Sequence, residues 1–278
     1  MAIRIVFNNG RLYLRRYYQF EQELKQAVAA RRTIKPMSEP QAQEQASLIK
    51  NIIAKLFPDS VNNSSANCTG MKQEIDWQAL AVANAINKDF AIIAGGPGTG
   101  KTYTVTKLLA ALLMLSLNTK GDEPTPRISL VAPTGKAAQR LSESIINAVQ
   151  GFRGSIDDDV LDLIPESAQT LHRLLGVIPE QVNFRHHQDN LLAVDILLID
   201  EVSMVDLPMM ARIFRALKPE TKIILLGDAD QLPSVAVGSV LADIAPRPHS
   251  GYSTENVAYL AQTCQLNSQH LIEAFKGE

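Results

Sequence analysis

The chain has 278 residues, of which 46% are apolar and 20% are charged, and its formal net charge is −2. This is the composition of an ordinary globular protein with one large domain or two modest ones, and it excludes disorder, collagen-like repeats and coiled coil as descriptions of the whole chain. The longest apolar run, residues 108–115, is far shorter than the ~20 residues that cross a bilayer. The net charge excludes a protein that coats nucleic acid by bulk positive charge, but it leaves room for a local basic groove.

The amino-terminal residues and the cysteines favour a cytoplasmic protein. Residues 1–5 lack the apolar core of a signal peptide. Cys68 and Cys264 are too few and too far apart in the sequence for a disulfide framework or a four-cysteine zinc site. We therefore expect a cytoplasmic protein that has no membrane partner.

The first 60 residues have the pattern of a small, mostly helical unit. Asn9-Gly10 between two short apolar runs predicts a β-hairpin. Apolar residues then recur at helical spacing in residues 20–28 and 48–56. Residues 61–73 are largely polar and predict a linker. We expect residues 1–60 to be the end of a small amino-terminal domain and residues 74–278 to form a larger domain.

Beyond the linker, short buried strands alternate with amphipathic helices. Continuous apolar runs of strand length suit a parallel sheet that is covered on both faces, and they occupy residues 90–94, 128–132, 195–199 and 222–226. Helical patterns lie between these runs, at residues 102–117, 135–149 and 207–217. Asp206 is the expected N-cap of the last helix. This order predicts a doubly wound α/β domain that binds its ligand at the carboxyl ends of the strands.

A glycine-rich segment follows the first of these strands and precedes a long helix. It reads Gly95-Gly96-Pro97-Gly98-Thr99-Gly100-Lys101-Thr102 and matches G-x-x-x-x-G-K-[ST], the P-loop pattern. Its glycines let the backbone N–H groups turn toward phosphate oxygens, and the helix presents its first amides to the same anion. We expect Lys101 to reach the terminal phosphates of ATP and the Thr102 hydroxyl to bind Mg²⁺. The segment therefore predicts a nucleotide phosphate site.

Two neighbouring carboxylates and one glutamine complete this predicted site. Asp200 follows a buried strand and is the candidate partner of Mg²⁺, and Glu201 is the candidate base that polarises the attacking water. The alternative is that both carboxylates cap the next helix. Gln231 follows the next strand, where it would contact the γ-phosphate, and the alternative there is a polar turn. The P-loop upstream favours the catalytic interpretation.

His186-His187 raises the question of a metal site. No cysteine or carboxylate cluster accompanies the two histidines at a spacing typical of metal ligands. Asp189-Asn190 instead favours a turn at this place. We expect a hairpin that faces solvent.

Together these segments resemble the superfamily 1 DNA helicases, and within them the alpha subunits of exodeoxyribonuclease V. The resemblance runs from about residue 74 to the C-terminus and includes the P-loop, residues 200–206 and residues 227–241. It implies a RecA-like P-loop NTPase domain, with a parallel sheet covered by helices. It also implies that Gln78 recognises adenine, that Tyr103 contacts the nucleotide, and that Lys101, Glu201 and Gln231 are catalytic.

Two further segments, residues 132–138 and 170–176, resemble the DNA-contacting motifs of the same family. The resemblance implies that single-stranded DNA is contacted by Pro133, Thr134, Lys136, His172 and Arg173. For Lys136, an ordinary solvated position on a helix is the alternative. The resemblance further implies an ATP-dependent 5′-to-3′ helicase of DNA double-strand break repair and recombination, with the other subunits of an exodeoxyribonuclease V complex as partners.

The sequence stops at Glu278, soon after the segment that contains Gln231. Motors of the resembled family have two RecA-like halves, and the second half supplies an arginine finger that stabilises the transition state. We therefore expect these residues alone to bind ATP, to hydrolyse it very slowly and to unwind no duplex. Two other classes of function stay open: a self-contained P-loop ATPase or kinase that does not act on DNA, and a non-catalytic scaffold. An effect of oligo-dT on ATP affinity would favour the helicase.

Overall fold

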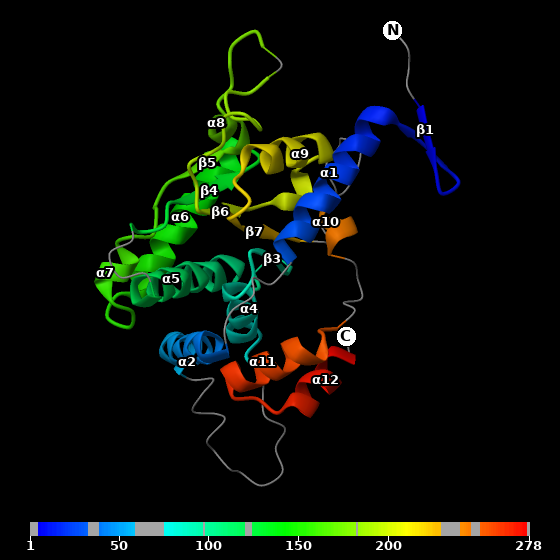
Figure 1. The fold of residues 1–278 in the computed structure, drawn as a ribbon. Coiled ribbons are helices and arrows are strands. Elements are labelled where there is room, and N and C mark those ends of the chain that lie inside the picture. Colours follow the sequence, from blue (N-terminus) through cyan, green and yellow to red (C-terminus); the bar gives the residue numbers. More distant parts are fainter. Residues whose placement is uncertain are drawn as a thin grey trace.

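A parallel five-stranded sheet lies at the centre of the computed structural model (Figure 1). The structure describes residues 5–32, 39–58, 75–96, 98–119, 124–181, 183–228, 240–245 and 251–276. The strand order is β3 (Phe90–Ala94), β7 (Lys222–Gly227), β6 (Ile196–Ile199), β4 (Ile128–Ala132) and β5 (Ala168–Thr170). Within the described residues, no helix combines the length and the apolarity that crossing a membrane requires.

The central strands are buried on both faces because nearly every side chain along them is apolar. In β6, Leu197 and Ile199 pack into one hydrophobic core, whereas Ile196 and Leu198 pack into the core on the opposite face. Each of these side chains is at least 94% buried, as the exposed fraction is 6% for Ile196 and 0% for the other three. Burial of one such side chain stabilises the fold by about 1.5–3 kcal/mol. The expected α/β fold with a doubly covered parallel sheet is confirmed.

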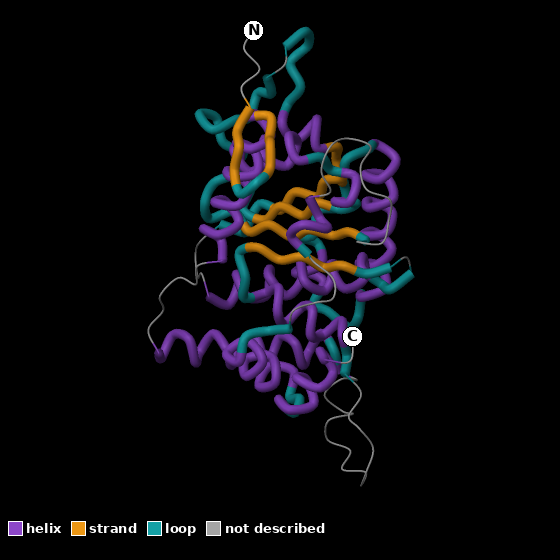
Figure 2. The backbone as a smooth tube through the Cα atoms, turned by 90° about the vertical axis from the view of Figure 1, so that its right-hand side faces the viewer, coloured by secondary structure: helices purple, strands orange, loops and turns teal. Residues whose placement is uncertain are grey.

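The strands lie side by side in Figure 2 with helices around them, and the two hydrophobic cores place helices on both faces of the sheet. One core contains residues of α4 (Trp77–Ile86), α5 (Lys101–Thr119) and α6 (Gly135–Phe152). The other core contains residues of α1 (Arg15–Arg32) and α9 (Leu207–Ala216). The sequence-based helices over residues 102–117, 135–149 and 207–217 therefore agree with α5, α6 and α9 to within a few residues.

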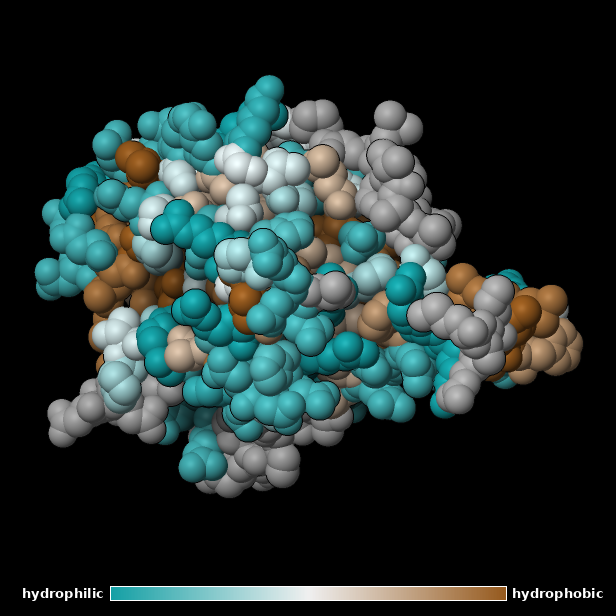
Figure 3. Space-filling view, turned by 90° about the horizontal axis from the view of Figure 1, so that it is seen from above, coloured by the Kyte–Doolittle hydropathy of each residue, from teal (hydrophilic) through white to brown (hydrophobic). Residues whose placement is uncertain are grey.

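The amino-terminal residues begin with a hairpin of β1 (Ile5–Asn8) and β2 (Arg11–Leu14). Asn9 and Gly10 have φ angles of 48° and 77°, so the two-residue turn that Asn-Gly predicts is confirmed. One face of the hairpin is apolar and more than half exposed, and it forms the protruding hydrophobic group at the right of Figure 3. The residues on that face are Ile5, Phe7, Leu12 and Leu14.

Both amino-terminal helices pack on the α/β core. The α1 helix lies along α9, and the Arg31 guanidinium donates a 2.8 Å hydrogen bond to the carbonyl oxygen of Lys218. The α2 helix (Glu39–Leu56) packs against α4, α5 and α11 (Thr254–Cys264). Residues 61–73 lie outside the described residues, and the division into residues 1–60 and 74–278 stays a prediction.

The remaining elements are short or follow the sheet in the chain. They are α7 (Asp158–Leu161), α8 (Leu171–Leu175), the 3₁₀ helix η1 (Val202–Met204), α10 (Val240–Ile244) and α12 (Ser268–Lys276). The α11 helix returns to the side of the sheet that α2 and α4 occupy. Burial there raises the pKa of the Cys264 thiol to about 12.

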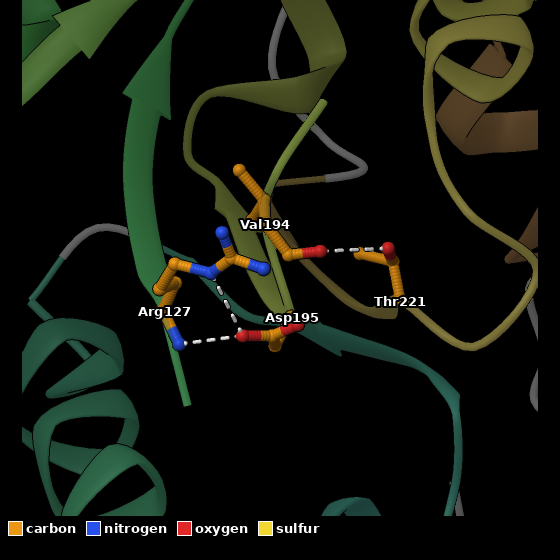
Figure 4. A network of polar contacts seen from close by, with 4 residues as sticks. All are labelled: Arg127, Val194, Asp195 and Thr221. Atoms are coloured by element: carbon orange, nitrogen blue, oxygen red, sulfur yellow. Dashed lines mark hydrogen bonds and ion pairs between the residues drawn. The ribbon is translucent and has the colours of Figure 1, made fainter. Parts of the chain in front are cut away.

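Polar contacts fix the amino-terminal ends of the central strands (Figure 4). The Arg127 backbone amide donates to the Asp195 carboxylate at 2.8 Å, and the Arg127 side chain donates to the same oxygen at 3.3 Å. The Thr221 hydroxyl donates to the carbonyl oxygen of Val194 at 2.9 Å. This edge of the sheet is therefore tied together by the protein's own groups.

Candidate active site

The described residues of the predicted site lie near the opposite edge of the sheet. Because the described strands of the sheet are all parallel, their carboxyl ends share that edge. The residues that follow the strands there are Gly95, Asp228, Asp200, Pro133 and Leu171. Only β7 separates the P-loop strand β3 from β6, which ends just before Asp200. Neighbouring strands are about 4.8 Å apart, so the axes of β3 and β6 are ~10 Å apart.

The glycine-rich segment forms a tight curl between β3 and α5. Gly98 and Gly100 have φ angles of +76° and +77°, in the left-handed region that glycine adopts without strain. The Lys101 ammonium donates to the carbonyl oxygens of Gly95 and Gly96 at 2.5 and 2.7 Å. A positive charge therefore lies inside the curl. Pro97 lies outside the described residues.

Gln78 lies against this curl from the first turn of α4. Its side-chain amide is 3.5 Å from the carbonyl oxygen of Thr99, and a Cβ atom on Gly100 would lie 2.7 Å from the same amide nitrogen. Asp76 caps α4 by accepting hydrogen bonds from the backbone N–H groups of Gln78 and Ala79, both at 3.0 Å. The structure thus brings Gln78 and the P-loop together.

Tyr103 follows Thr102 but its ring is engaged elsewhere. The ring lies edge-on to Phe152 of α6, with 4.5 Å between the centroids. The Lys107 ammonium is 4.8 Å from the centroid of the Tyr103 ring. The side chain is 43% exposed. A contact between Tyr103 and the nucleotide stays a prediction.

Asp200 is largely buried at the end of β6. Its backbone N–H donates to the carbonyl oxygen of Val131 at 2.9 Å, and its carboxylate accepts from the N–H of Glu201 at 2.9 Å. Burial raises the pKa of the Asp200 carboxyl above its ordinary value, and the nearby charge of Glu201 acts in the same direction. The charge of Lys101 opposes this rise in pKa. Asp200 and Lys101 therefore interact electrostatically across the site.

Glu201 adopts a left-handed backbone conformation, with φ 53° and ψ 41°. This conformation costs a residue other than glycine roughly 1–2 kcal/mol. It is held in place by the N–H of Met204, which donates to the carbonyl oxygen of Glu201 at 3.0 Å. The Glu201 side chain makes no capping hydrogen bond, and α9 is capped instead by Asp206, which accepts from the N–H of Met209 at 2.7 Å. The predicted cap at Asp206 is confirmed.

The end of β7 lies beside the start of the glycine-rich segment. The Gly95 N–H donates to the carbonyl oxygen of Gly227 at 3.2 Å, and Asp228 is 4% exposed. A Cβ atom on Gly227 would lie 2.6 Å from the Leu241 side chain, so α10 packs closely on the strand and a larger residue here would displace Leu241. Gln231 lies outside the described residues, and its contact with the γ-phosphate stays a prediction.

The two segments with predicted DNA contacts follow β4 and β5, which are neighbours in the sheet. Pro133 is half-buried and Lys136 is exposed. The Thr134 hydroxyl accepts from the N–H of Ala137 at 3.2 Å and caps α6. Thr134 thus has a structural role whatever it binds.

His172 and Arg173 are exposed on α8. Thr170 caps this short helix by accepting from the N–H of Arg173 at 3.2 Å. The His172 ring lies 5.8 Å from the ring of Phe184. The structure therefore brings the two segments to the same edge, beside the end of β6.

The donor set of the site suits a hard cation such as Mg²⁺. The Thr102 hydroxyl and the Asp200 carboxylate offer oxygen ligands, which Mg²⁺ prefers. Among the described residues, no three His, Cys, Asp or Glu side chains gather as a metal cluster. One or two protein ligands are typical of a Mg²⁺ ion that is bound together with phosphates. His187 and Asn190 exchange backbone hydrogen bonds of 3.1 and 3.0 Å, so the expected hairpin is confirmed, with its turn at Gln188-Asp189, one residue earlier than expected.

A lysine lies inside a glycine-rich curl between a parallel strand and a long helix, and a largely buried aspartate follows a strand two places away in the sheet. These features define a P-loop nucleotide-binding domain of the RecA-like α/β class. The comparison with known families agrees with this class. The chain belongs to the AAA domain family, whose model matches residues 78–237.

The chain is also similar to known proteins over about two thirds of its length. RecBCD enzyme subunit RecD of Haemophilus influenzae is 49% identical over 195 residues, which are 69% of this chain and 29% of that protein. RecD of Mycolicibacterium smegmatis is 44% identical over 190 residues, 66% of this chain and 32% of that protein. The ATP-dependent RecD2 DNA helicase of Deinococcus radiodurans is 34% identical over 202 residues, 72% of this chain and 24% of that protein. The chain thus matches less than a third of the length of each of these three relatives. The RecD-like character indicated by its motifs is confirmed.

Proposed function

We propose that this chain is the first motor domain of an ATP-dependent 5′-to-3′ DNA helicase. It works in the cytoplasm as a subunit of an exodeoxyribonuclease V complex, in DNA double-strand break repair and recombination. The observation that carries the proposal is that the P-loop, Asp200-Glu201 and the two candidate DNA segments share one edge of a single parallel sheet. Similarity to RecD supports the choice of a helicase among P-loop proteins.

The P-loop binds Mg-ATP in this proposal. Lys101 exchanges its contacts with the carbonyl oxygens of Gly95 and Gly96 for the terminal phosphates, because a phosphate is a stronger partner for an ammonium than a neutral carbonyl. Thr102 and Asp200 hold the Mg²⁺, which neutralises phosphate charge when it is bound. Gln78, beside Gly100, contacts the adenine base.

Glu201 and Gln231 act on the terminal phosphate. Glu201 accepts a proton from the attacking water, because a carboxylate with no capping hydrogen bond is available as a base. Gln231 contacts the γ-phosphate from the segment after β7. The left-handed backbone of Glu201, two residues after β6 ends, suits its role, since strained backbone is common where a side chain must be aimed at a reacting group.

Single-stranded DNA crosses the ends of β4 and β5. Pro133, Thr134, Lys136, His172 and Arg173 contact its backbone, which carries no sequence information. One hydrogen bond connects the proposed nucleotide site to the proposed DNA site. The N–H of Asp200 donates to the carbonyl oxygen of Val131, which lies two residues before Pro133. A change at Asp200 therefore has a short path to the DNA side.

The test is the coupling between the two ligands. We expect saturating oligo-dT to change the affinity of the chain for Mg-ATP, and Mg-ATP to change the affinity for oligo-dT by the same factor, because coupling free energies are reciprocal. Isothermal titration in both orders measures the two factors. Lys136→Ala with Arg173→Ala is the matched variant, since it should lose the coupling and keep ATP binding. A P-loop kinase, or a scaffold that does not act on DNA, would show no coupling in the wild-type chain.

A further inference from the structure

A pocket lies between α9 and the loop that connects α8 to β6. We call residues 177–181 and 183–190 the arm; it projects beyond α8 in Figure 1. Backbone hydrogen bonds anchor its base, from Arg185 to the carbonyl oxygen of Gly176 at 2.8 Å and from His186 to that of Leu175 at 2.9 Å. The pocket has a volume of about 590 Å³, and its lining includes Phe184, Arg185, His186, His187, Arg212 and Arg215.

The charges around this pocket do not cancel. Asp189 is the carboxylate in its lining, and it lies 3.6 Å from the ring of His187. Arg215 is paired with Glu23 of α1 through two hydrogen bonds of 2.7 and 2.9 Å. Within the described part of the chain, Arg185 and Arg212 have no carboxylate at ion-pair distance. The pocket therefore offers two guanidinium groups to an anion.

An aromatic ring connects the pocket to the candidate DNA edge. The Phe184 ring lies between the His172 ring, with 5.8 Å between centroids, and the Arg212 guanidinium, 5.3 Å from the ring centroid. The row His172–Phe184–Arg212 therefore runs without a break from the exposed face of α8 to the pocket. A strand that contacts His172 and Arg173 passes within reach of the arm.

We propose that the arm pocket is a second phosphate site, in which Arg185 and Arg212 bind the backbone of the nucleic acid that crosses α8. The proposal rests on the proposed function, because it extends the DNA path beyond His172 and Arg173. Unpaired guanidinium groups favour phosphate, whose oxygens they contact through two parallel N–H groups. Such contacts add affinity without sequence preference and make binding more sensitive to salt.

The experiment compares two lengths of DNA on the full chain. The test variant is Arg185→Ala with Arg212→Gln, and fluorescence anisotropy measures binding to oligo-dT of about 6 and about 20 nucleotides. We expect the variant to bind the long oligonucleotide about 10-fold more weakly and the short one normally. Its plot of log affinity against log salt should be shallower by about 1–2 for the long oligonucleotide. Unchanged thermal unfolding shows that the variant is folded.

The control variant is Arg127→Ala with Arg153→Ala, which removes the same charge away from the arm. Arg127 lies at the amino-terminal edge of the sheet, and Arg153 is paired with Asp158 and Asp162. We expect this control to bind both oligonucleotides as the wild-type chain does. A test variant that behaves like the control overturns the arm site and leaves the proposed function standing, whereas a wild-type chain that binds neither oligonucleotide overturns both.

Two further binding measurements identify the anion that the pocket takes. A duplex with a dT overhang, compared with single-stranded dT of equal total length, distinguishes duplex phosphates from single-strand phosphates, and a loss on either DNA supports the site. Poly-glutamate tests for an acidic protein segment. Loss of poly-glutamate binding in Arg185→Ala with Arg212→Gln, at unchanged affinity for both DNAs, would overturn the phosphate site in favour of a protein partner.

Discussion

Lys101 and Asp200 lie just beyond the ends of different strands, and the charge of Lys101 acts on the pKa of the Asp200 carboxyl. Lys101 makes two hydrogen bonds to carbonyl oxygens of its own loop. Asp200 is held by backbone groups of β4 and Glu201, in a place where burial raises the pKa of its carboxyl. Neither side chain contributes to the apolar cores. Substitutions of these residues should therefore affect ligands more than folding.

Lys101→Ala is expected to weaken Mg-ATP binding at least 10-fold, because the variant loses a charge-assisted contact with the terminal phosphates. Isothermal titration measures the affinity. Thermal unfolding of the ligand-free variant should match the wild-type chain, since the lost hydrogen bonds are replaced by water at a half-exposed site. Lys136→Ala is the control, with the same substitution at an exposed position on the DNA side. Wild-type affinity in Lys101→Ala would contradict the phosphate site.

Asp200→Asn is expected to unfold at the same temperature as the wild-type chain, or a higher one, when no metal or nucleotide is present. Folding raises the pKa of Asp200, so the folded chain holds this proton more tightly than the unfolded chain does. The contribution of Asp200 to stability is therefore present at low pH and lost as the pH rises through the folded pKa. At neutral pH, asparagine removes the cost of the buried charge.

The same variant should lose the response to magnesium. Mg-ADP should raise the Tm of the wild-type chain above the value that ADP gives without metal, because a ligand that binds only the folded state stabilises it. In Asp200→Asn, the Tm with Mg-ADP and the Tm with ADP alone should be equal. A variant that unfolds earlier than the wild-type chain and still responds to Mg²⁺ would show that Asp200 has a structural role instead.

The α2 and α5 helices meet at a buried lysine. The Lys107 ammonium donates to the carbonyl oxygen of Leu56, at the C-terminus of α2, over 2.6 Å. It also lies 4.1, 4.8 and 5.5 Å from the ring centroids of Phe57, Tyr103 and Phe152. A cation at a helix C-terminus and over aromatic faces is favourable on both counts. Lys107 thus ties the amino-terminal α2 to the helix that carries the P-loop lysine.

Lys107→Met is expected to lower the Tm by several degrees. Loss of the helix cap and of the aromatic contacts is worth about 1–3 kcal/mol, and 1 kcal/mol shifts the Tm of a domain of this size by roughly 2–4 °C. Lys55→Ala is the matched control near the same end of α2. It breaks an exposed ion pair with Asp157, which contributes little. Equal shifts in the two variants would mean that the buried lysine adds no stability of its own.

Features that depend on local sequence were predictable, and features that depend on tertiary contacts were not. The P-loop, the caps and the apolar strands are encoded within a few residues of each other. By contrast, β5 reads Ala-Gln-Thr, three half-buried residues without an apolar run, and it is a strand because it pairs with β4. Gln78 lies beside Gly100, and Lys107 contacts the carbonyl oxygen of Leu56. Both contacts depend on how separate helices pack, which no spacing along the chain encodes.

At the scale of the whole molecule, the two edges of the sheet carry different side chains. The amino-terminal edge of the sheet is closed by contacts such as Arg127–Asp195, whereas the carboxyl edge carries Lys101, Lys136 and Arg173. At that edge, Asp200, Glu201 and Asp228 follow β6 and β7, whereas Lys136 and Arg173 follow β4 and β5, so the exposed positive charge lies on the DNA side. Affinity for a polyanion at such an edge depends on a few contacts and on the counterions they release.

DNA binding should accordingly be independent of sequence and sensitive to salt. If about four phosphates are neutralised, the plot of log affinity against log salt for single-stranded DNA should have a slope near −3. Fluorescence anisotropy with oligo-dT and with a mixed sequence of equal length measures both properties. Lys136→Ala should reduce the slope by about 1 on both oligonucleotides. A clear preference for one sequence would contradict contacts that are confined to the backbone.

The contact of Lys107 with the end of α2 also has a consequence for local unfolding. Helices α2, α4, α5 and α11 share one hydrophobic core, so α2 is expected to open together with α5 as one cooperative unit. Amide protons of α2 would then exchange with solvent only when the P-loop helix opens. A nucleotide at the first turn of α5 should therefore slow hydrogen exchange in residues 39–56, a segment that it does not contact. Hydrogen–deuterium exchange with and without Mg-ADP measures this protection, and Lys107→Met should diminish it.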